Sequence, residues 1–175
     1  MWAQTSCGVG AAGAGLRAMA AAPGIGVVIA SAIAEDRRPL GHEGGDAFLE
    51  VVRSAEGALH VGLGRATLTM TVRDDMLNGH DICHGGFITL LADSAFAFAC
   101  NARNVVTVAA GLTVDFLAPA HGGDVLTAVA QETSRAGRTG VYDMVVTNQQ
   151  GTRVALVRGR SHSLNRSVLP AKESA

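Results

Sequence analysis

The segment NGHDICHGG, residues 78–86, leads directly into FITLLADSAFAFAC, residues 87–100, a run that is almost wholly apolar. With almost no polar face, the run predicts a helix that is buried on all sides within a core. Its single charged residue is Asp93, and the nearest permanent cation along the chain, Arg103, lies beyond the run. Burial of an ionised carboxylate is costly unless the group is paired or its pKa shifts. A carboxylate in such a position therefore indicates a function.

Hydrophobic residues around this run recur with a period of two, which is typical of strands. Apolar residues at 66, 68, 70 and 72 alternate with threonines and predict a half-buried strand. Residues 59–63 are expected to pair with it through the Gly64-Arg65 turn, after a short helix near 47–53. Four more strands are predicted near 105–116, 125–132, 141–147 and 153–161, with glycine-containing turns between them.

The short connections make neighbouring strands antiparallel, so the pattern indicates a meander that covers the buried helix. The predicted fold class is α+β, with an antiparallel sheet of five to six strands wrapped around a long central helix.

The composition is that of one domain without a strong charge. The chain has 175 residues, a net charge of -1, 17% charged residues and 4% aromatic residues. Scattered basic residues and few aromatic ones give no indication of nucleic acid or a membrane surface as a partner. Three cysteines, at positions 7, 83 and 100, are an odd number without CxxC spacing. They favour a reducing compartment, and the expected location is cytoplasmic.

The two ends of the chain differ from the middle. Residues 1–45 are rich in Ala and Gly and are predicted to be a disordered N-terminal extension, or to lie partly upstream of a true start at Met19. An apolar stretch in this region weakly resembles a secretory signal, but Pro23 and several glycines interrupt it. It is also too short to span a membrane. The domain is expected to occupy residues 46–165, and 166–175 to form a solvated tail.

Two glycines at the start of the predicted helix indicate a site for negative charge. Gly85 and Gly86 place unpaired backbone N–H groups at the positive end of the helix dipole, where a carbonyl can approach closely. The arrangement suits an oxyanion, although two glycines also make a simple tight turn. Asp93 follows Gly85 at a spacing of ~12 Å along a helix, too far for one chain to apply both groups to one carbonyl. In a two-fold dimer with antiparallel helices, Asp93 of the partner subunit would lie opposite Gly85.

Four separated motifs, NGHxxCHGG, LADSAFAFAC, VDFLAP and TGVYD, resemble those of the hotdog-fold acyl-CoA thioesterases of the phenylacetate-degradation type, over about residues 48–165. The resemblance implies a hotdog fold, dimers that pair into homotetramers, and no metal or other cofactor. It also implies hydrolysis of aryl or arylacetyl thioesters of coenzyme A, of the phenylacetyl-CoA or hydroxyphenylacetyl-CoA type.

The resemblance assigns roles to individual residues. The helix-N-terminal glycine that polarises the thioester carbonyl matches Gly85, and the helix aspartate that attacks or activates water matches Asp93. Three further catalytic positions match Asn78, His84 and Ser94, with serine standing where threonine is frequent. Contacts with the substrate are expected from Gly86, Leu77, Phe87, Arg138 and Thr139.

The residues leave several roles open. Asp93 can act as a nucleophile through a mixed anhydride, or as a general base on a water held by Asn78 or Ser94. His84 can hold the thioester or serve the turn through a hydrogen bond from its ring to the backbone. Coenzyme A phosphates call for basic residues, and the candidates, each of which can equally be an ordinary surface arginine, are Arg135, Arg138, Arg158 and Arg160.

Three other interpretations compete with hydrolysis. His80, Asp81, Cys83 and His84 include zinc-ligand types, but their spacing is poor and no second cluster accompanies them, so no metal is expected. A module that binds acyl-CoA without hydrolysis has no need of a carboxylate in an apolar helix. A hotdog hydratase or dehydratase usually has an Asp and His pair on a loop, or a His and Glu pair split between subunits, and neither is found in the sequence.

Overall fold

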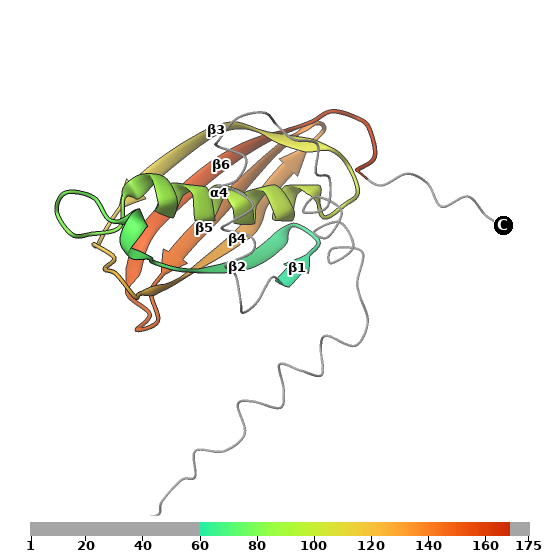
Figure 1. The fold of residues 1–175 in the computed structure, drawn as a ribbon. Helices are drawn as coiled ribbons and strands as arrows, with labels where there is room; N and C mark the ends of the chain where they lie inside the picture. The colour runs from blue at the N-terminus through green and yellow to red at the C-terminus, as the bar shows by residue number, and fades with distance from the viewer. Residues whose placement is uncertain (1–59, 169–175) are drawn as a thin grey trace, which may run out of the picture.

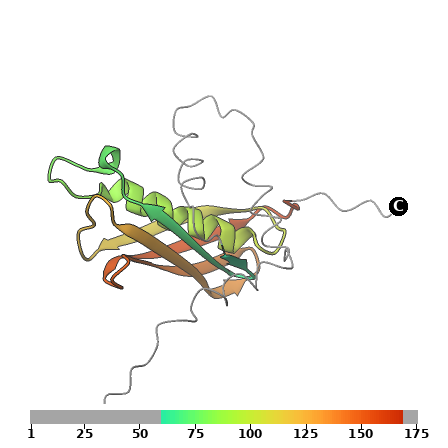
Figure 2. The same ribbon diagram turned by 60° about the horizontal axis from the view of Figure 1, so that its bottom comes forward.

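The computed structural model describes residues 60–168, in which one long helix lies along a single antiparallel sheet (Figure 1). Figure 2 shows the sheet on one side of this helix. The helices are the 3-10 helix η2 (Asp74–Met76) and α4 (Gly85–Asn101). The strands are β1 (His60–Gly62), β2 (Arg65–Thr71), β3 (Thr107–Phe116), β4 (Val125–Ala136), β5 (Thr139–Thr147) and β6 (Arg153–Ser163). The predicted α+β class, with six strands wrapped around a central helix, is confirmed.

The order of the strands across the sheet corrects the predicted meander. Neighbouring strands follow the order β1-β2-β4-β5-β6-β3, and all pairs are antiparallel. The hairpins β1–β2, β4–β5 and β5–β6 follow the short turns as expected. However, β3 lies beside β6 at one edge, and residues 117–124 carry the chain across to β4. A short turn makes two strands neighbours only when they follow one another directly in the chain. Because α4 lies between β2 and β3, turn length does not predict where β3 lies in the sheet.

The hairpin between β4 and β5 is longer than the sequence predicts. β4 continues to Ala136 and β5 begins at Thr139, because Gly137, with φ of +56°, and Arg138 form a two-residue turn. Residues 133–139 are all exposed, so no alternation of apolar and polar residues marks them as strands. A bulge between Glu132 and Ser134 also shifts the pairing of β4 with β5.

The core lies between α4 and the sheet, and small residues let the two approach closely. Alternate residues of β2 and β4 are buried against the helix, namely Ala66, Leu68, Met70, Leu126, Ala128 and Ala130. On β6, a Cβ added at Gly159 would lie 3.0 Å from ring atoms of Phe96. The Phe96 ring in turn packs on Tyr142 of β5, with ring centroids 5.1 Å apart. The aromatic residues of α4 therefore fill spaces that alanine and glycine leave on the sheet.

The helix is not buried on all sides, which corrects the prediction. Gly86 is exposed, and Leu90, Asp93 and Ala97 are only partly buried, and these four residues lie at helical spacing. They form a stripe of small and apolar residues along α4 with Asp93 in its middle. We call these four residues the open stripe.

Several predictions fall outside the described residues. These are the helix near 47–53, the N-terminal extension and most of the C-terminal tail. Arg166, the first residue of the predicted tail, accepts a backbone hydrogen bond from Val106 at 2.8 Å. In the part of the chain that is described, no helix is long and apolar enough to cross a membrane.

Candidate active site

The start of α4 is shaped by His84. This residue is the N-cap, with extended backbone (φ -62°, ψ 131°), and its Nδ1 accepts the Gly86 N–H at 2.9 Å. In a neutral imidazole, an accepting Nδ1 leaves the proton on Nε2. The ring is thus bonded to the backbone of the turn, which is one of the two roles considered for His84. Its Nε2–H remains directed away from this bond.

The Gly85 N–H differs from its neighbours in having no acceptor among the described residues. The Gly86 N–H is bonded by the His84 ring, and the Phe87 N–H donates to the His84 carbonyl at 2.9 Å. No acceptor within residues 60–168 takes the Gly85 N–H. This group lies at the first residue of a 17-residue helix, where the helix dipole favours negative charge. An unpaired donor at this position is suited to bind a carbonyl oxygen that develops negative charge.

The ring of Phe116, at the end of β3, lies against Gly85. A Cβ added at Gly85 would be 2.7 Å from the Phe116 Cζ, a distance that real Cβ atoms essentially never show. Phe116 is nevertheless 54% exposed. The glycine therefore serves two purposes here, because it presents a free N–H and it lets an aromatic ring approach the backbone.

The loop before α4 holds the other predicted residues of this end. Asn78 Oδ1 accepts the His80 N–H at 2.8 Å, and the backbone of Asn78 bonds Ile82 and Asp81. Leu77 forms an isolated bridge with Cys83 and packs against the core. The Asn78 side chain thus stabilises the loop through its oxygen, while its amide N–H groups have no acceptor among the described residues.

Asp93 lies on the open stripe, and among residues 60–168 no cation forms an ion pair with it. Burial disfavours its charged form and raises the pKa of the Asp93 carboxyl above the ordinary value of 3.8. Arg103, the nearest cation along the chain, instead binds Glu132, with Nη2 2.8 Å from Oε1. A raised pKa in a partly apolar place is typical of carboxylates that act as bases or nucleophiles.

Ser94 is turned inward in this structure. It is 1% exposed, and its Oγ donates to the Leu90 carbonyl at 2.7 Å within the helix. The hydroxyl is thus satisfied by its own helix. A role in holding water stays a prediction.

Arg138 and Thr139 lie at the opposite end of the sheet from Gly85. They form the β4–β5 turn, where Arg138 Nε donates to the Ser163 carbonyl at 2.9 Å. Ser163 pairs with Thr107, the first residue of β3, beside the C-terminal end of α4. The structure therefore brings together Leu77, Asn78, His84, Gly85, Gly86 and Phe87, and separates them from Arg138 and Thr139 of the same chain.

The cysteines and the predicted zinc-ligand types show no metal-binding arrangement. Cys83 and Cys100 are buried free thiols. Burial raises the pKa of Cys83, and it raises the pKa of Cys100 to about 12. Within residues 60–168, no three side chains of His, Cys, Asp or Glu are close enough together to hold a metal ion.

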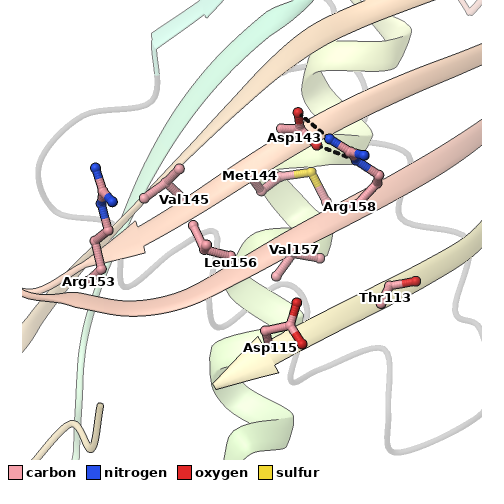
Figure 3. Close-up of a pocket in the computed structure, with 9 residues that line it drawn as sticks. All are labelled: Thr113, Asp115, Asp143, Met144, Val145, Arg153, Leu156, Val157 and Arg158. Carbon is pink, nitrogen blue, oxygen red and sulfur yellow. Dashed lines mark hydrogen bonds and ion pairs between the residues drawn. The ribbon is translucent and has the colours of Figure 1, made fainter. Parts of the chain in front are cut away.

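A hollow with a cavity volume of about 570 Å³ lies elsewhere, on the face of the sheet turned away from α4 (Figure 3). Arg158, a candidate for coenzyme A phosphates, is bound there to Asp143 through two hydrogen bonds of 2.7 and 2.9 Å. Asp143 thus lies in an ion pair on the face of the sheet opposite α4. None of the predicted catalytic residues lines this hollow, so it is not the site around Gly85.

Phe116 is the residue of this region that the sequence did not identify. In the sequence it stands within the VDFLAP motif, and no spacing rule connects it with Gly85, 31 positions earlier in the chain. The only available signal was an aromatic residue at the end of a period-two pattern.

An antiparallel sheet wrapped around one long central helix is the hotdog fold. A family model described as the Thioesterase superfamily matches residues 80–155. The chain is 50% identical over 105 residues to the acyl-coenzyme A thioesterase PaaI of Escherichia coli, covering 60% of this chain and 75% of that protein. It is also 34% identical over 107 residues to a putative esterase of Archaeoglobus fulgidus, covering 61% of this chain and 70% of that protein.

Solved structures agree with these relatives. The structure of E. coli PaaI, from the phenylacetic acid degradation operon, aligns with a TM-score of 0.70 and 40% identity over 82% of this chain and 96% of that one. The TT0310 protein of Thermus thermophilus aligns with a TM-score of 0.59 and 39% identity over 62% of this chain and 91% of that one. The chain belongs to the thioesterase superfamily, and it is an enzyme of the thioester hydrolase class. The resemblance to the phenylacetate-degradation type is confirmed.

Proposed function

We propose that the protein hydrolyses aryl or arylacetyl thioesters of coenzyme A, of the phenylacetyl or hydroxyphenylacetyl type, to the free acid and coenzyme A. The observation that carries this proposal is the unpaired Gly85 N–H at the start of the helix that also contains the half-buried Asp93. The aryl preference rests on similarity to E. coli PaaI, the protein of a phenylacetic acid degradation operon. The substrate is thus the main partner, and no metal or cofactor enters the reaction as proposed.

The chemistry needs a donor and an attacking group. The thioester carbonyl accepts the Gly85 N–H, and negative charge on its oxygen is stabilised there as the tetrahedral intermediate forms. Asp93 either attacks the carbonyl carbon itself or takes a proton from an attacking water. The C–S bond then breaks, and coenzyme A leaves as the thiolate. In the general-base route this step gives the free acid directly, and in the nucleophile route a water then hydrolyses the acyl–Asp93 anhydride to the free acid and regenerates the carboxylate. His84 orients the turn, Asn78 offers its amide N–H groups, and Ser94 stands next to the carboxylate in sequence.

We infer that each site is shared by two subunits. Gly85 and Asp93 are ~12 Å apart along one helix. The open stripe offers small and apolar residues to a second helix. In addition, β3 is an edge strand of 10 residues, and no strand among the described residues pairs with its outer side, so a second subunit can pair there. A two-fold axis beside them would bring Asp93 of the partner subunit towards Gly85, and the partner's Arg138 and Thr139 to the same end. Dimers of this kind would pair again into tetramers.

The remaining expectations complete the proposal. The catalytic domain occupies about residues 46–165 after an N-terminal extension. The reduced state of Cys83 and Cys100 suits a cytoplasmic location.

Gly85→Pro, with Gly85→Ala as its steric control, tests the donor. Both variants add a Cβ beside Phe116, but only proline removes the N–H. Proline is tolerated at the first residue of a helix, and the extended backbone of His84 suits the position before proline. Release of coenzyme A from phenylacetyl-CoA should fall by a further ~100-fold or more in Gly85→Pro relative to Gly85→Ala. Equal activity of the two variants would exclude the N–H as the donor.

Mixed dimers test the shared site. Gly85→Pro and Asp93→Asn chains, each inactive alone, are co-expressed with different tags. If sites are shared, each mixed dimer has one intact site, and the population should recover about a quarter of native turnover. No recovery would place both groups in one chain. Retained acyl-CoA binding without turnover in the native protein would instead favour a non-hydrolytic binding module.

A further inference from the structure

We propose that Phe116 is a specificity-determining residue, whose ring forms the wall against which the acyl group of the substrate packs at Gly85. The inference rests on the proposed function, because it takes the Gly85 N–H as the group that binds the thioester carbonyl. It assigns the preference for aryl groups to a residue of β3, outside the motifs of α4 and its preceding loop.

The register of β3 directs Phe116 towards the helix. Phe116 pairs with Ala155 of β6, which is fully buried. Leu112 and Val114, two and four residues earlier on the same face, pack against the core. Phe116 continues this inward row, but it lies where α4 begins, so its ring meets Gly85 instead of entering the core.

The ring lies beside the residue that would bind the substrate carbonyl. A carbonyl oxygen that accepts the Gly85 N–H lies about 2.9 Å from the Gly85 nitrogen. The Phe116 ring tip is already so close to Gly85 that a single added Cβ would overlap it. Groups attached to that carbonyl can therefore pack against the ring when they extend towards the Cβ side of Gly85.

The exposure of the ring has no structural explanation within the described part of the chain. Phe116 is 54% exposed although its neighbours on the same face are partly buried in the core. A flat, half-open aromatic surface beside a free N–H is suited to an aromatic acyl group, because paired rings gain more than their burial alone provides. It also excludes water from one side of the donor.

Leu117 provides a matched control. It follows Phe116 just beyond the end of β3 and is 53% exposed, and the three atoms nearest to a Cβ added at Gly85 all belong to the Phe116 ring. Replacing Leu117 removes an apolar side chain of comparable exposure from the same edge of the sheet, and it leaves the Phe116 ring beside Gly85 in place.

The test compares binding of two unreactive ketone analogues, in which CH₂ replaces the thioester sulfur of phenylacetyl-CoA and of hexanoyl-CoA. Dissociation constants are measured by calorimetry for the full chain and for Phe116→Ala, Phe116→Leu, Phe116→Tyr and Leu117→Ala. The preference for the phenylacetyl analogue should fall about three- to tenfold in Phe116→Ala and Phe116→Leu, and persist in Phe116→Tyr and Leu117→Ala.

An unchanged preference in Phe116→Ala, an equal loss in Leu117→Ala, or no preference in the native protein would overturn the proposal. The readout does not depend on hydrolysis. A native protein that binds the analogues with the expected preference but releases no coenzyme A from the thioesters would refute the proposed function and leave the role of Phe116 standing.

Discussion

The Asn101 side chain binds both backbone polar groups of Thr107. Its Oδ1 accepts the Thr107 N–H at 2.9 Å, and its Nδ2 donates to the Thr107 carbonyl at 2.8 Å and to the Ala97 carbonyl at 2.9 Å. These bonds join the last residue of α4 to the first residue of β3. They fix the start of β3 relative to the C-terminal end of α4. Because β3 runs back along the helix, they also influence where Phe116, its last residue, lies relative to Gly85.

Asn101→Ala should destabilise the fold by about 1–3 kcal/mol, because it leaves buried backbone groups without partners. Asn101 is only 8% exposed, so water cannot easily replace the lost bonds. Urea denaturation measures the change. Gln131→Ala, at an exposed position of β4, is the control and should change stability by no more than about 0.5 kcal/mol. A change in Asn101→Ala as small as that of the control would show that this connection contributes little.

Asp93→Asn should lower turnover by about two or more orders of magnitude while stabilising the fold at neutral pH. Burial raises the pKa of Asp93 above 3.8, so between that value and the raised one the folded chain binds more protons than the unfolded chain. Native stability therefore falls as the pH rises through this window, and the neutral amide escapes the loss. Denaturation of both proteins at several pH values should show a difference that appears above about pH 4. A difference that does not vary with pH would contradict this assignment.

The same shift should appear in catalysis. If Asp93 must be ionised to act, the acid limb of kcat/KM is displaced above the ordinary value of 3.8 for aspartic acid. Steady-state rates between about pH 3 and 8 measure the limb. An acid limb at the ordinary aspartate value would contradict the prediction, because it would show that water reaches the Asp93 carboxylate in the active protein.

Glu132→Gln tests a second partly buried charge, near the other end of α4. Burial opposes the charge of Glu132, but hydrogen bonds from Arg103 and Tyr142, both of 2.8 Å, outweigh it and hold the Glu132 pKa below 4.5. The stabilisation is present above pH 4.5 and is lost as the pH falls through the lowered pKa. Glu132→Gln should cost about 1–3 kcal/mol at neutral pH.

The exposed pair of Asp143 and Arg158 serves as the control for Glu132. Its two side chains are 42% and 64% exposed, so Asp143→Asn should cost about 0–1 kcal/mol. Thermal unfolding of both variants at neutral pH makes the comparison. Similar losses would mean that burial adds nothing to the Glu132 pair.

The sequence predicted those parts of the fold that repeat a local pattern. The apolar run gave α4, and alternating residues gave β2, because burial of one face imposes a period on neighbouring residues. The position of β3 beside β6, and hence the contact of Phe116 with Gly85, depends on a crossing between distant segments that no local period records. The unpaired Gly85 N–H was expected from the glycines at a helix start. The ion pair between Arg103 and Glu132, which keeps this cation from Asp93, depends on tertiary packing.

Cys83 and Cys100 should resist alkylation in the native protein and react only on unfolding. Thiolate is the reactive form, and with the pKa of Cys100 at about 12, roughly one thiol in ten thousand is ionised at pH 8. A Cys7→Ser chain restricts the experiment to these two thiols, and iodoacetamide labelling read by peptide mass spectrometry measures their reactivity with and without urea. Turnover should survive treatment of the native protein. Loss of turnover in step with alkylation of Cys83 would instead make that thiol part of the site, since Cys83 directly precedes the residue that caps α4.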